Sequence, residues 1–155
     1  VLSTLRQVAC QPQTQHTWVV GDNGTLLRSD DASSPFRPVP LPTEENLFSV
    51  GFSDDGAVLF LVGNAGTLLR STDGGHSFTP VPTGSPQTVR IAHFIPELGE
   101  FVIAGVGGLL MLTKQRTIPQ RLAGRFEGRF DHLIFHAASK SIIVAGDRLL
   151  RLPTP

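Results

Sequence analysis

Apolar and polar residues alternate in short runs along the chain, separated by turns rich in Gly, Pro, Asp and Asn. Residues 57–62 are apolar almost throughout, which is typical of a strand buried on both faces. Residues 53–56, Ser-Asp-Asp-Gly, carry the Asp-Gly signal of a hairpin turn. No stretch has the 3.6-residue apolar spacing of an amphipathic helix. The pattern therefore predicts an all-β protein with essentially no helix.

One segment recurs along the chain at a spacing of 42 residues. Residues 62–71 read Val-Gly-Asn-Ala-Gly-Thr-Leu-Leu-Arg-Ser, and residues 20–29 read Val-Gly-Asp-Asn-Gly-Thr-Leu-Leu-Arg-Ser. Weaker copies occupy residues 104–113 and 145–151. A repeat of this length that holds four strands is typical of a β-propeller, because such a unit needs neighbours to cover both of its faces.

We therefore predict a β-propeller, or an arc of one, built of four-stranded antiparallel blades of about 42 residues. The expected blades are residues 1–43, 44–86, 87–127 and 128–155, with the last one strand short, so about 3.75 blades are present. An open arc would expose blade faces and strand edges. We expect this single domain to belong to a larger ring, completed by another copy or by a further chain segment.

A glycine follows the second strand of every copy, at Gly21, Gly63, Gly105 and Gly146. A positive φ angle or a close backbone approach is the usual reason for glycine at such a place.

A motif follows the third strand of the second repeat. Residues 71–78, Ser-Thr-Asp-Gly-Gly-His-Ser-Phe, fit the Asp-box pattern Ser-x-Asp-x-Gly-x-x-aromatic. We expect the carboxylate to accept backbone N–H bonds, glycine to allow a left-handed residue, and the aromatic ring to fill the gap beside the blade. Residues 29–36 are a degenerate copy and residues 113–118 a weaker one. The structural residues of the complete box are Ser71, Asp73, Gly75 and Phe78.

Together with the Val-Gly-x-x-Gly-Thr-Leu-Leu-Arg-Ser segment ahead of the box, the chain resembles the photosystem II stability/assembly factor family over nearly all of its 155 residues. The resemblance implies a seven-bladed propeller, of which roughly half is present. It also implies a non-catalytic scaffold, exported to a periplasm or an organelle lumen, that docks on a membrane-protein complex. The eroded third and fourth boxes depart from the family pattern.

Charge and composition narrow the function only slightly. The net charge is zero, which gives no support to nucleic-acid binding. Residues 1–77 carry four Lys/Arg and eight Asp/Glu, whereas residues 78–155 carry nine and five. Cys10 is the one cysteine, so an internal disulfide is excluded, and we expect it to be a small buried side chain. No apolar run reaches the ~18 residues of a membrane helix.

The chain begins at Val1 and shows no basic-then-apolar signal segment, so we expect a processed or shortened chain.

Five basic residues gather where the third Asp box has decayed: Lys114, Arg116, Arg121, Arg125 and Arg129. Only Glu127 offsets them within this segment. Such a cluster can dock an acidic protein patch or anionic headgroups. The simpler interpretation is a solvated edge strand that charge protects from aggregation.

Enzyme chemistry finds little support. Asp boxes also occur in glycoside hydrolases, but sialidases use a Tyr nucleophile and the chain has no Tyr. The carboxylates that a two-carboxylate glycosidase could use, Asp54, Asp55, Glu97 and Glu100, all fall in expected turns. His132 and His136 would lie ~13 Å apart along a strand, too far for one metal ion. The glycine-rich residues 105–108 precede no helix that could bind phosphate.

These observations predict a protein-interaction and assembly scaffold with no catalytic, cofactor or metal site. Its expected partner is a membrane-protein complex or another envelope protein, not a nucleic acid or a small-molecule substrate. The alternative is a fragment of a carbohydrate-binding or glycoside-hydrolase-type Asp-box propeller. A sugar reader needs several aromatic side chains on one rim, and Trp18 is the only Trp.

Overall fold

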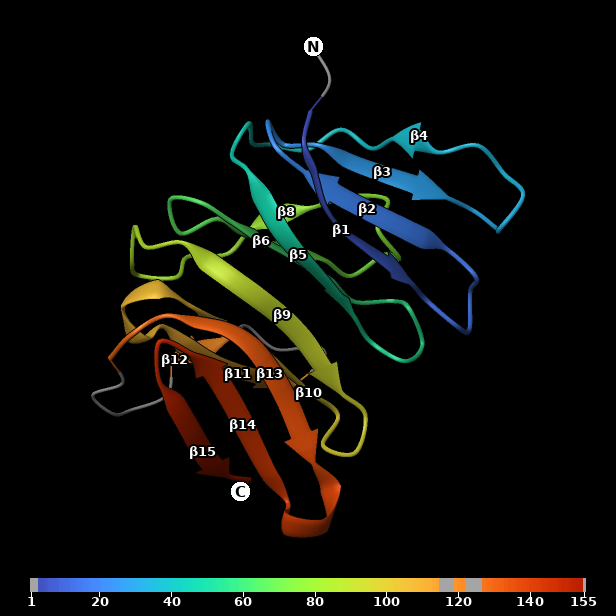
Figure 1. Ribbon diagram of the computed structural model, residues 1–155. Helices are drawn as coiled ribbons and strands as arrows, with labels where there is room; N and C mark the ends of the chain where they lie inside the picture. Colours follow the sequence, from blue (N-terminus) through green and yellow to red (C-terminus); the bar gives the residue numbers. More distant parts are fainter. Residues whose placement is uncertain (1–2, 115–118, 122–126, 155) are drawn as a thin grey trace.

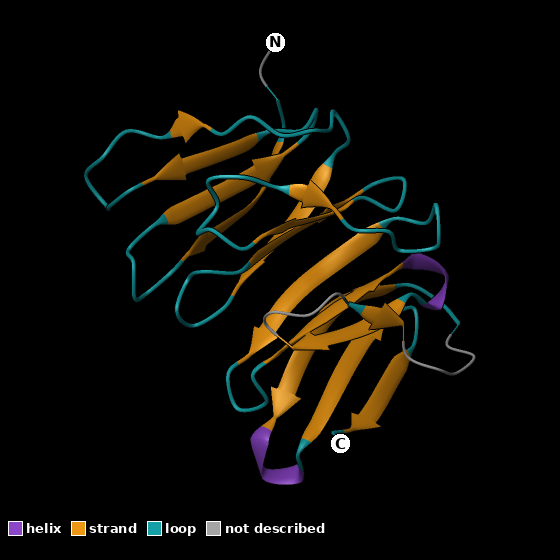
Figure 2. Ribbon diagram, turned by 180° about the vertical axis from the view of Figure 1, so that it is seen from behind, coloured by secondary structure: helices purple, strands orange, loops and turns teal. Residues whose placement is uncertain are grey.

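The computed structural model describes residues 3–114, 119–121 and 127–154 (Figure 1). Within these residues the chain is all-β, as the sequence predicts. Helical geometry is limited to two single 3-10 turns, η1 (Val106–Gly108) and η2 (Ala137–Ser139), both in loops between strands (Figure 2). No described helix is long and apolar enough to cross a membrane.

The strands form four antiparallel sheets that follow chain order. The first sheet holds β1 (Leu5–Cys10), β2 (Thr17–Gly21), β3 (Leu26–Ser29) and β4 (Arg37–Pro38). The second holds β5 (Leu47–Phe52), β6 (Leu59–Gly63), β7 (Leu68–Ser71) and β8 (Thr79–Pro80). The third holds β9 (Val89–Ile95), β10 (Glu100–Gly105), β11 (Leu110–Lys114) and β12 (Gln120–Arg121). The fourth holds β13 (Phe130–His136), β14 (Ser141–Gly146) and β15 (Leu149–Pro153).

The sheets are arranged as successive propeller blades. Their first strands, β1, β5, β9 and β13, lie side by side and contact one another in that order (Figure 1). Successive sheets pack face to face, as the blades of a propeller do. Three apolar cores lie between consecutive sheets.

The central strands are buried because a sheet covers each of their faces. All five residues of β6 are buried, which confirms the interpretation of the apolar run as a fully buried strand. Between the second and third sheets, the rings of Phe60 and Phe101 meet edge to face with centroids 4.8 Å apart. Such aromatic pairs stabilise a core beyond the area that they bury.

The glycines after the second strands are explained by close approach and not by positive φ. A Cβ atom on Gly63 would lie 2.2 Å from the carbonyl oxygen of Asn46, at the entry to β5. Gly21, Gly105 and Gly146 face the equivalent carbonyl in their own sheets. Asn64 donates a backbone hydrogen bond of 3.0 Å to this same Asn46 oxygen, so the first two strands close tightly at this end.

The outer strands are short, and one expectation about a single residue is wrong. The outer strands β4 and β8 hold only two residues each, since the prolines around them cannot donate ladder hydrogen bonds. Cys10 is exposed and not buried. It lies on the side of β1 that no other sheet covers, whereas the equivalent Phe94 of the third sheet is buried.

Candidate functional site: a groove along the first strands

A groove of about 640 Å³ runs across the first strands of all four sheets. Its lining comes from β1, β5, β9 and β13 and from the loops at their ends. These first strands lie side by side, as Figure 1 shows, and the groove crosses them. A second hollow is bordered by four side chains of this lining together with Thr4 and Leu5.

Four side chains at one repeat position form a row between these hollows: Arg6, Phe48, Arg90 and Asp131. Each is the residue after the one that pairs with the strand-end glycine of its sheet. Because the sheets repeat the same register, their side chains emerge at the same level of neighbouring blades.

The Phe48 ring lies between two guanidinium groups. The Cζ atom of Arg6 is 4.9 Å from the ring centroid, and the Cζ atom of Arg90 is 5.1 Å from it. Both distances are within the range of cation–π attraction. Three neighbouring blades thus contribute one stacked Arg–Phe–Arg unit.

Carboxylates hold both arginines in place. Asp22 accepts hydrogen bonds from Nε and Nη2 of Arg6, the second at 3.0 Å, and these bonds raise the pKa of Arg6. Asp131 forms an ion pair with Arg90 and another, at 2.7 Å, with Arg129. Carboxylates therefore hold all three guanidinium groups in place along the row.

Side chains one position further along the first strands join the blades laterally. The Gln7 side-chain oxygen accepts a 2.7 Å hydrogen bond from the backbone N–H of Val50 in the next sheet. Ser49, the repeat equivalent of Gln7, contacts the backbone of Ala92 in the sheet after that. These side chains satisfy strand-edge groups, so they belong to the scaffold of the groove.

The imidazole of His93 also lines the groove. Desolvation lowers the pKa of His93, and the nearby Glu97 opposes this effect. The groove thus presents a neutral imidazole at pH 7 beside the charged row.

The Asp-box turn lies between β7 and β8, on strands at the far side of the sheet from the groove. Asp73 Oδ1 accepts backbone hydrogen bonds from His76 and Ser77, both at 3.0 Å, and a 2.7 Å bond from the Ser71 hydroxyl. These bonds, with the Ser77 hydroxyl bond as the largest contribution, hold the pKa of Asp73 well below its usual range. The turn is a closed set of internal hydrogen bonds.

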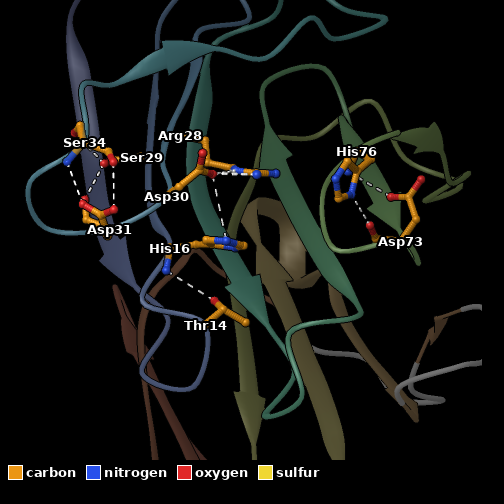
Figure 3. A network of polar contacts seen from close by, with 9 residues as sticks. All are labelled: Thr14, His16, Arg28, Ser29, Asp30, Asp31, Ser34, Asp73 and His76. Atoms are coloured by element: carbon orange, nitrogen blue, oxygen red, sulfur yellow. Dashed lines mark hydrogen bonds and ion pairs between the residues drawn. The ribbon is translucent and has the colours of Figure 1, made fainter.

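The degenerate copy forms the same kind of turn without the glycine. Asp31 accepts a backbone hydrogen bond from Ser33 at 2.8 Å. It accepts another from Ser34 at 2.7 Å, which Figure 3 shows. The Ser33 and Ser34 hydrogen bonds lower the pKa of Asp31 to about 2. Ser29 donates to the Ser34 carbonyl across the turn, as Figure 3 shows. The hydroxyls of Ser33 and Ser34 also donate hydrogen bonds to the Asp31 carboxylate, both at 2.8 Å.

The complete box also joins two sheets. Phe78 is 8 % exposed and packs into the core between the first and second sheets. Trp18 of the first sheet is fully buried, and its indole ring lies where a Cβ atom on Gly75 would be. The ring therefore cannot act as an exposed platform for a sugar.

Three members of the basic cluster belong to the described residues, on β11, on β12 and just before β13. Arg116 and Arg125 lie outside the described residues. Lys114 is the last residue of β11 and pairs with Glu100 of β10. Arg121 of β12 pairs with Met111 of β11. Arg129 lies near the other end of β11, where Gly108 donates a backbone hydrogen bond to Gly128, and it belongs to the ion pairs of the groove.

The carboxylate and histidine residues considered as enzyme or metal-site candidates lie at different places in the fold. Asp55 holds the β5–β6 turn by accepting hydrogen bonds from Ser53 and Ala57. On β13, His132 lines the groove, whereas His136 bonds to Ser139 at 2.6 Å. No group of three or more His, Cys, Asp or Glu side chains that could hold a metal ion occurs in the described ranges.

Sequence inspection missed the Arg–Phe–Arg unit. Its members, Arg6, Phe48 and Arg90, are spaced at 42 residues, so aligning the repeats would have placed them together. Their chemistry differs from copy to copy, however, so no motif marks them.

Comparison with known proteins gives the fold but no family. No protein-family model matches the chain, and no curated protein matches it. Solved structures do. A structure of YCF48 bound to D1 peptide has a TM-score of 0.71 at 22 % identity, covering 94 % of this chain and 49 % of that one. YCF48 from Cyanidioschyzon merolae has a TM-score of 0.72 at 18 % identity, covering 96 % and 53 %.

An enzyme shares the architecture as well. The dihydro-heme d1 dehydrogenase NirN has a TM-score of 0.70 at 16 % identity, covering 92 % of this chain and 33 % of that one. This chain spans about half the length of the two YCF48 chains. At these identities the likeness shows that the chain has a propeller-type blade arrangement similar to that of YCF48.

Proposed function

We propose that the chain is a non-catalytic interaction scaffold that holds an extended peptide segment of a membrane-protein partner in the groove. The stacked Arg6–Phe48–Arg90 unit carries this proposal, because it joins oriented charge to an apolar ring within an open groove. The YCF48 structure with a D1 peptide supports it, since a similar fold there binds a peptide.

The chemistry of the unit suits a peptide. A guanidinium has five N–H donors, and Asp22 takes two of those of Arg6. The remaining donors can bond to peptide carbonyl or carboxylate oxygens. The guanidinium groups cover the faces of the half-buried Phe48 ring, so its edge is the part that can contact an apolar side chain. Because carboxylates and the ring already hold both arginines, binding loses little side-chain entropy.

No sugar-binding or catalytic alternative gains a comparable observation. The only Trp is buried, and the Phe48 ring is covered by guanidinium groups. We place the protein in a periplasm or an organelle lumen, as the family resemblance implies. The basic cluster around Lys114 and Arg121 is a second docking surface in this proposal, steering an acidic partner toward the groove.

The test is capture from detergent-solubilised membranes, identified by mass spectrometry, followed by titration of synthetic peptides from the captured protein. We expect Phe48→Ala and Arg90→Gln to weaken peptide binding at least about tenfold. Phe36→Ala, which truncates an exposed ring away from the groove, is the matched control and should leave binding unchanged.

Arg121→Glu with Arg125→Glu should slow capture, and more strongly at low salt. If Phe48→Ala binds as tightly as the native chain while remaining folded, the groove is not the binding site. Equal capture by the charge-reversed variant would remove the basic cluster from the proposal.

A further inference from the structure

Two side chains join neighbouring sheets by bonding to the backbone of the next first strand. Gln7 of the first sheet accepts a 2.7 Å hydrogen bond from the N–H of Val50. Ser49, at the same repeat position of the second sheet, accepts a 3.4 Å bond from the N–H of Ala92. Counted from the residue that pairs with the strand-end glycine, the acceptor is two residues further along and the donor three. The repeat thus satisfies one edge N–H group at each of these two junctions.

The third sheet does not continue this pattern. Ile91 occupies the repeat position of Gln7 and Ser49, and its side chain has no acceptor atom. The equivalent donor in the fourth sheet is the backbone N–H of Leu133. In the part of the chain that the structure describes, no side chain accepts a hydrogen bond from this N–H. The junction between β9 and β13 therefore lacks the bond that closes the two junctions before it.

Both backbone groups of Leu133 point away from β14. In an antiparallel pair, residues that bond to the partner strand alternate with residues whose N–H and C=O face the other way. Val50 and Ala92 are of the second kind, because their N–H groups bond to side chains of the preceding sheet. Leu133 has the same register as these two residues, and it lines the groove. A donor and an acceptor of one residue therefore face the groove.

A larger side chain also keeps this junction open. A Cβ atom on Gly51 would lie 2.5 Å from the carbonyl oxygen of Ala92, so β5 and β9 lie in direct contact there. The third sheet has His93 at the repeat position of Gly51, and this residue lines the groove. Because an imidazole replaces a hydrogen atom, β13 cannot approach β9 as closely as β9 approaches β5.

We propose that the segment bound in the groove pairs with Leu133 through its main chain. A carbonyl oxygen of the segment accepts from the Leu133 N–H, and an N–H of the segment donates to the Leu133 carbonyl, as in a strand added to a sheet edge. The occupant is an extended polypeptide that is recognised here by its backbone. This inference rests on the proposed peptide function, and it places the segment across β9 and β13, which lie side by side (Figure 1).

The charged row lies next to this main-chain site. Arg90 directly precedes Ile91, and Asp131 lies two residues before Leu133. These two charged residues form an ion pair between the same two sheets. A segment bonded to Leu133 therefore reaches the charged row within one or two residues of extended chain. The main-chain bonds fix the position of the segment, and the row selects among its polar groups.

The first test restores the repeat pattern in the third sheet. Ile91→Gln supplies the acceptor that Gln7 supplies at the first junction, so this side chain competes with the peptide for the Leu133 N–H. The probe is the tightest-binding synthetic peptide of the capture experiment, acetylated and amidated so that its ends carry no charge. We expect Ile91→Gln to bind the probe about tenfold more weakly than Ile91→Met, which has the same length but no oxygen. Circular dichroism and thermal unfolding check that both variants are folded.

Amide exchange tests the bond in the native chain. In protein labelled with isotopic leucine, the saturating probe should slow exchange of the Leu133 amide at least about tenfold, as read by NMR. The amide of Leu68, on β7 and away from the groove, is the control and should not change. A bound probe that leaves the Leu133 amide unprotected overturns this inference while the peptide groove stands, and so do equal affinities of the two Ile91 variants. If no peptide binds the native chain, the proposed function fails, and this inference fails with it.

Discussion

At the scale of single residues, Asp73 shows how a short motif stabilises a turn. Its carboxylate accepts bonds from two backbone N–H groups and two hydroxyls within five residues. The Ser71 hydroxyl in turn accepts from the backbone N–H of Gly75 at 2.9 Å. Such local networks form as soon as the turn closes, because every partner is near in sequence.

Asp73→Ala should lower the free energy of unfolding by about 1–2 kcal/mol, since the turn loses hydrogen bonds while remaining open to water. Chemical denaturation measures this change. Asp54→Ala, at an exposed turn carboxylate of the β5–β6 loop, is the matched control and should change stability little. Equal midpoints for both variants would mean that the box contributes nothing to stability.

Acid should unfold the protein partly through the same carboxylates. The pKa values of Asp31 and Asp73 are lower in the folded chain than in the unfolded chain. Their contribution is therefore complete above the ordinary carboxyl pKa of about 4 and is lost as pH falls toward 2. The melting temperature should fall over this interval, and less steeply in Asp73→Ala. Parallel pH profiles of the two proteins would contradict this assignment.

At the scale of elements, the Asp-box turn acts as a contact between blades as well as a turn. Gly74 and Gly75 both have positive φ, at 70° and 83°. A Cβ atom on Gly75 would lie 2.3 Å from the Trp18 ring, whereas one on Gly74 would approach nothing closer than 3.7 Å. Both glycines are therefore required by the backbone conformation, but only Gly75 is also required by the packing of Trp18.

Gly75→Ala should destabilise the protein more than Gly74→Ala, because both strain the backbone but only the first forces Trp18 to move. We expect Gly74→Ala to cost about 1 kcal/mol and Gly75→Ala about 1–3 kcal/mol more. Thermal unfolding and the Trp18 fluorescence spectrum are the measurements. An unchanged spectrum in Gly75→Ala with equal losses in both variants would show that the indole does not pack on this turn.

At the scale of the whole molecule, the four sheets differ in how many of their faces are packed against another sheet. The second and third sheets have a neighbour on each face, whereas the first and fourth have one. Amide exchange reports such differences, because sheets with fewer buried contacts open more readily.

The amides of β14 should therefore exchange faster than those of β6. Hydrogen exchange read by mass spectrometry tests this statement. Equal protection of the two strands would mean that stability is uniform along the arc.

Local features followed from the sequence because their determinants lie within a few residues. The strand alternation, the turn glycines and the repeat spacing indicated all-β blades, and the structure confirms them. The buried strand β6 was readable for the same reason. The two-residue length of β4 and β8 was not, because it depends on how far each outer segment stays paired with β3 or β7.

Tertiary structure alone decided the features that join different blades. Cys10 is exposed because no sheet covers its side of β1, a fact that no local pattern encodes. The stacking of Phe48 between Arg6 and Arg90 arises because three first strands run side by side in one register. A sequence repeat determines which positions are equivalent, but only the lateral packing of the sheets determines which unlike side chains meet there.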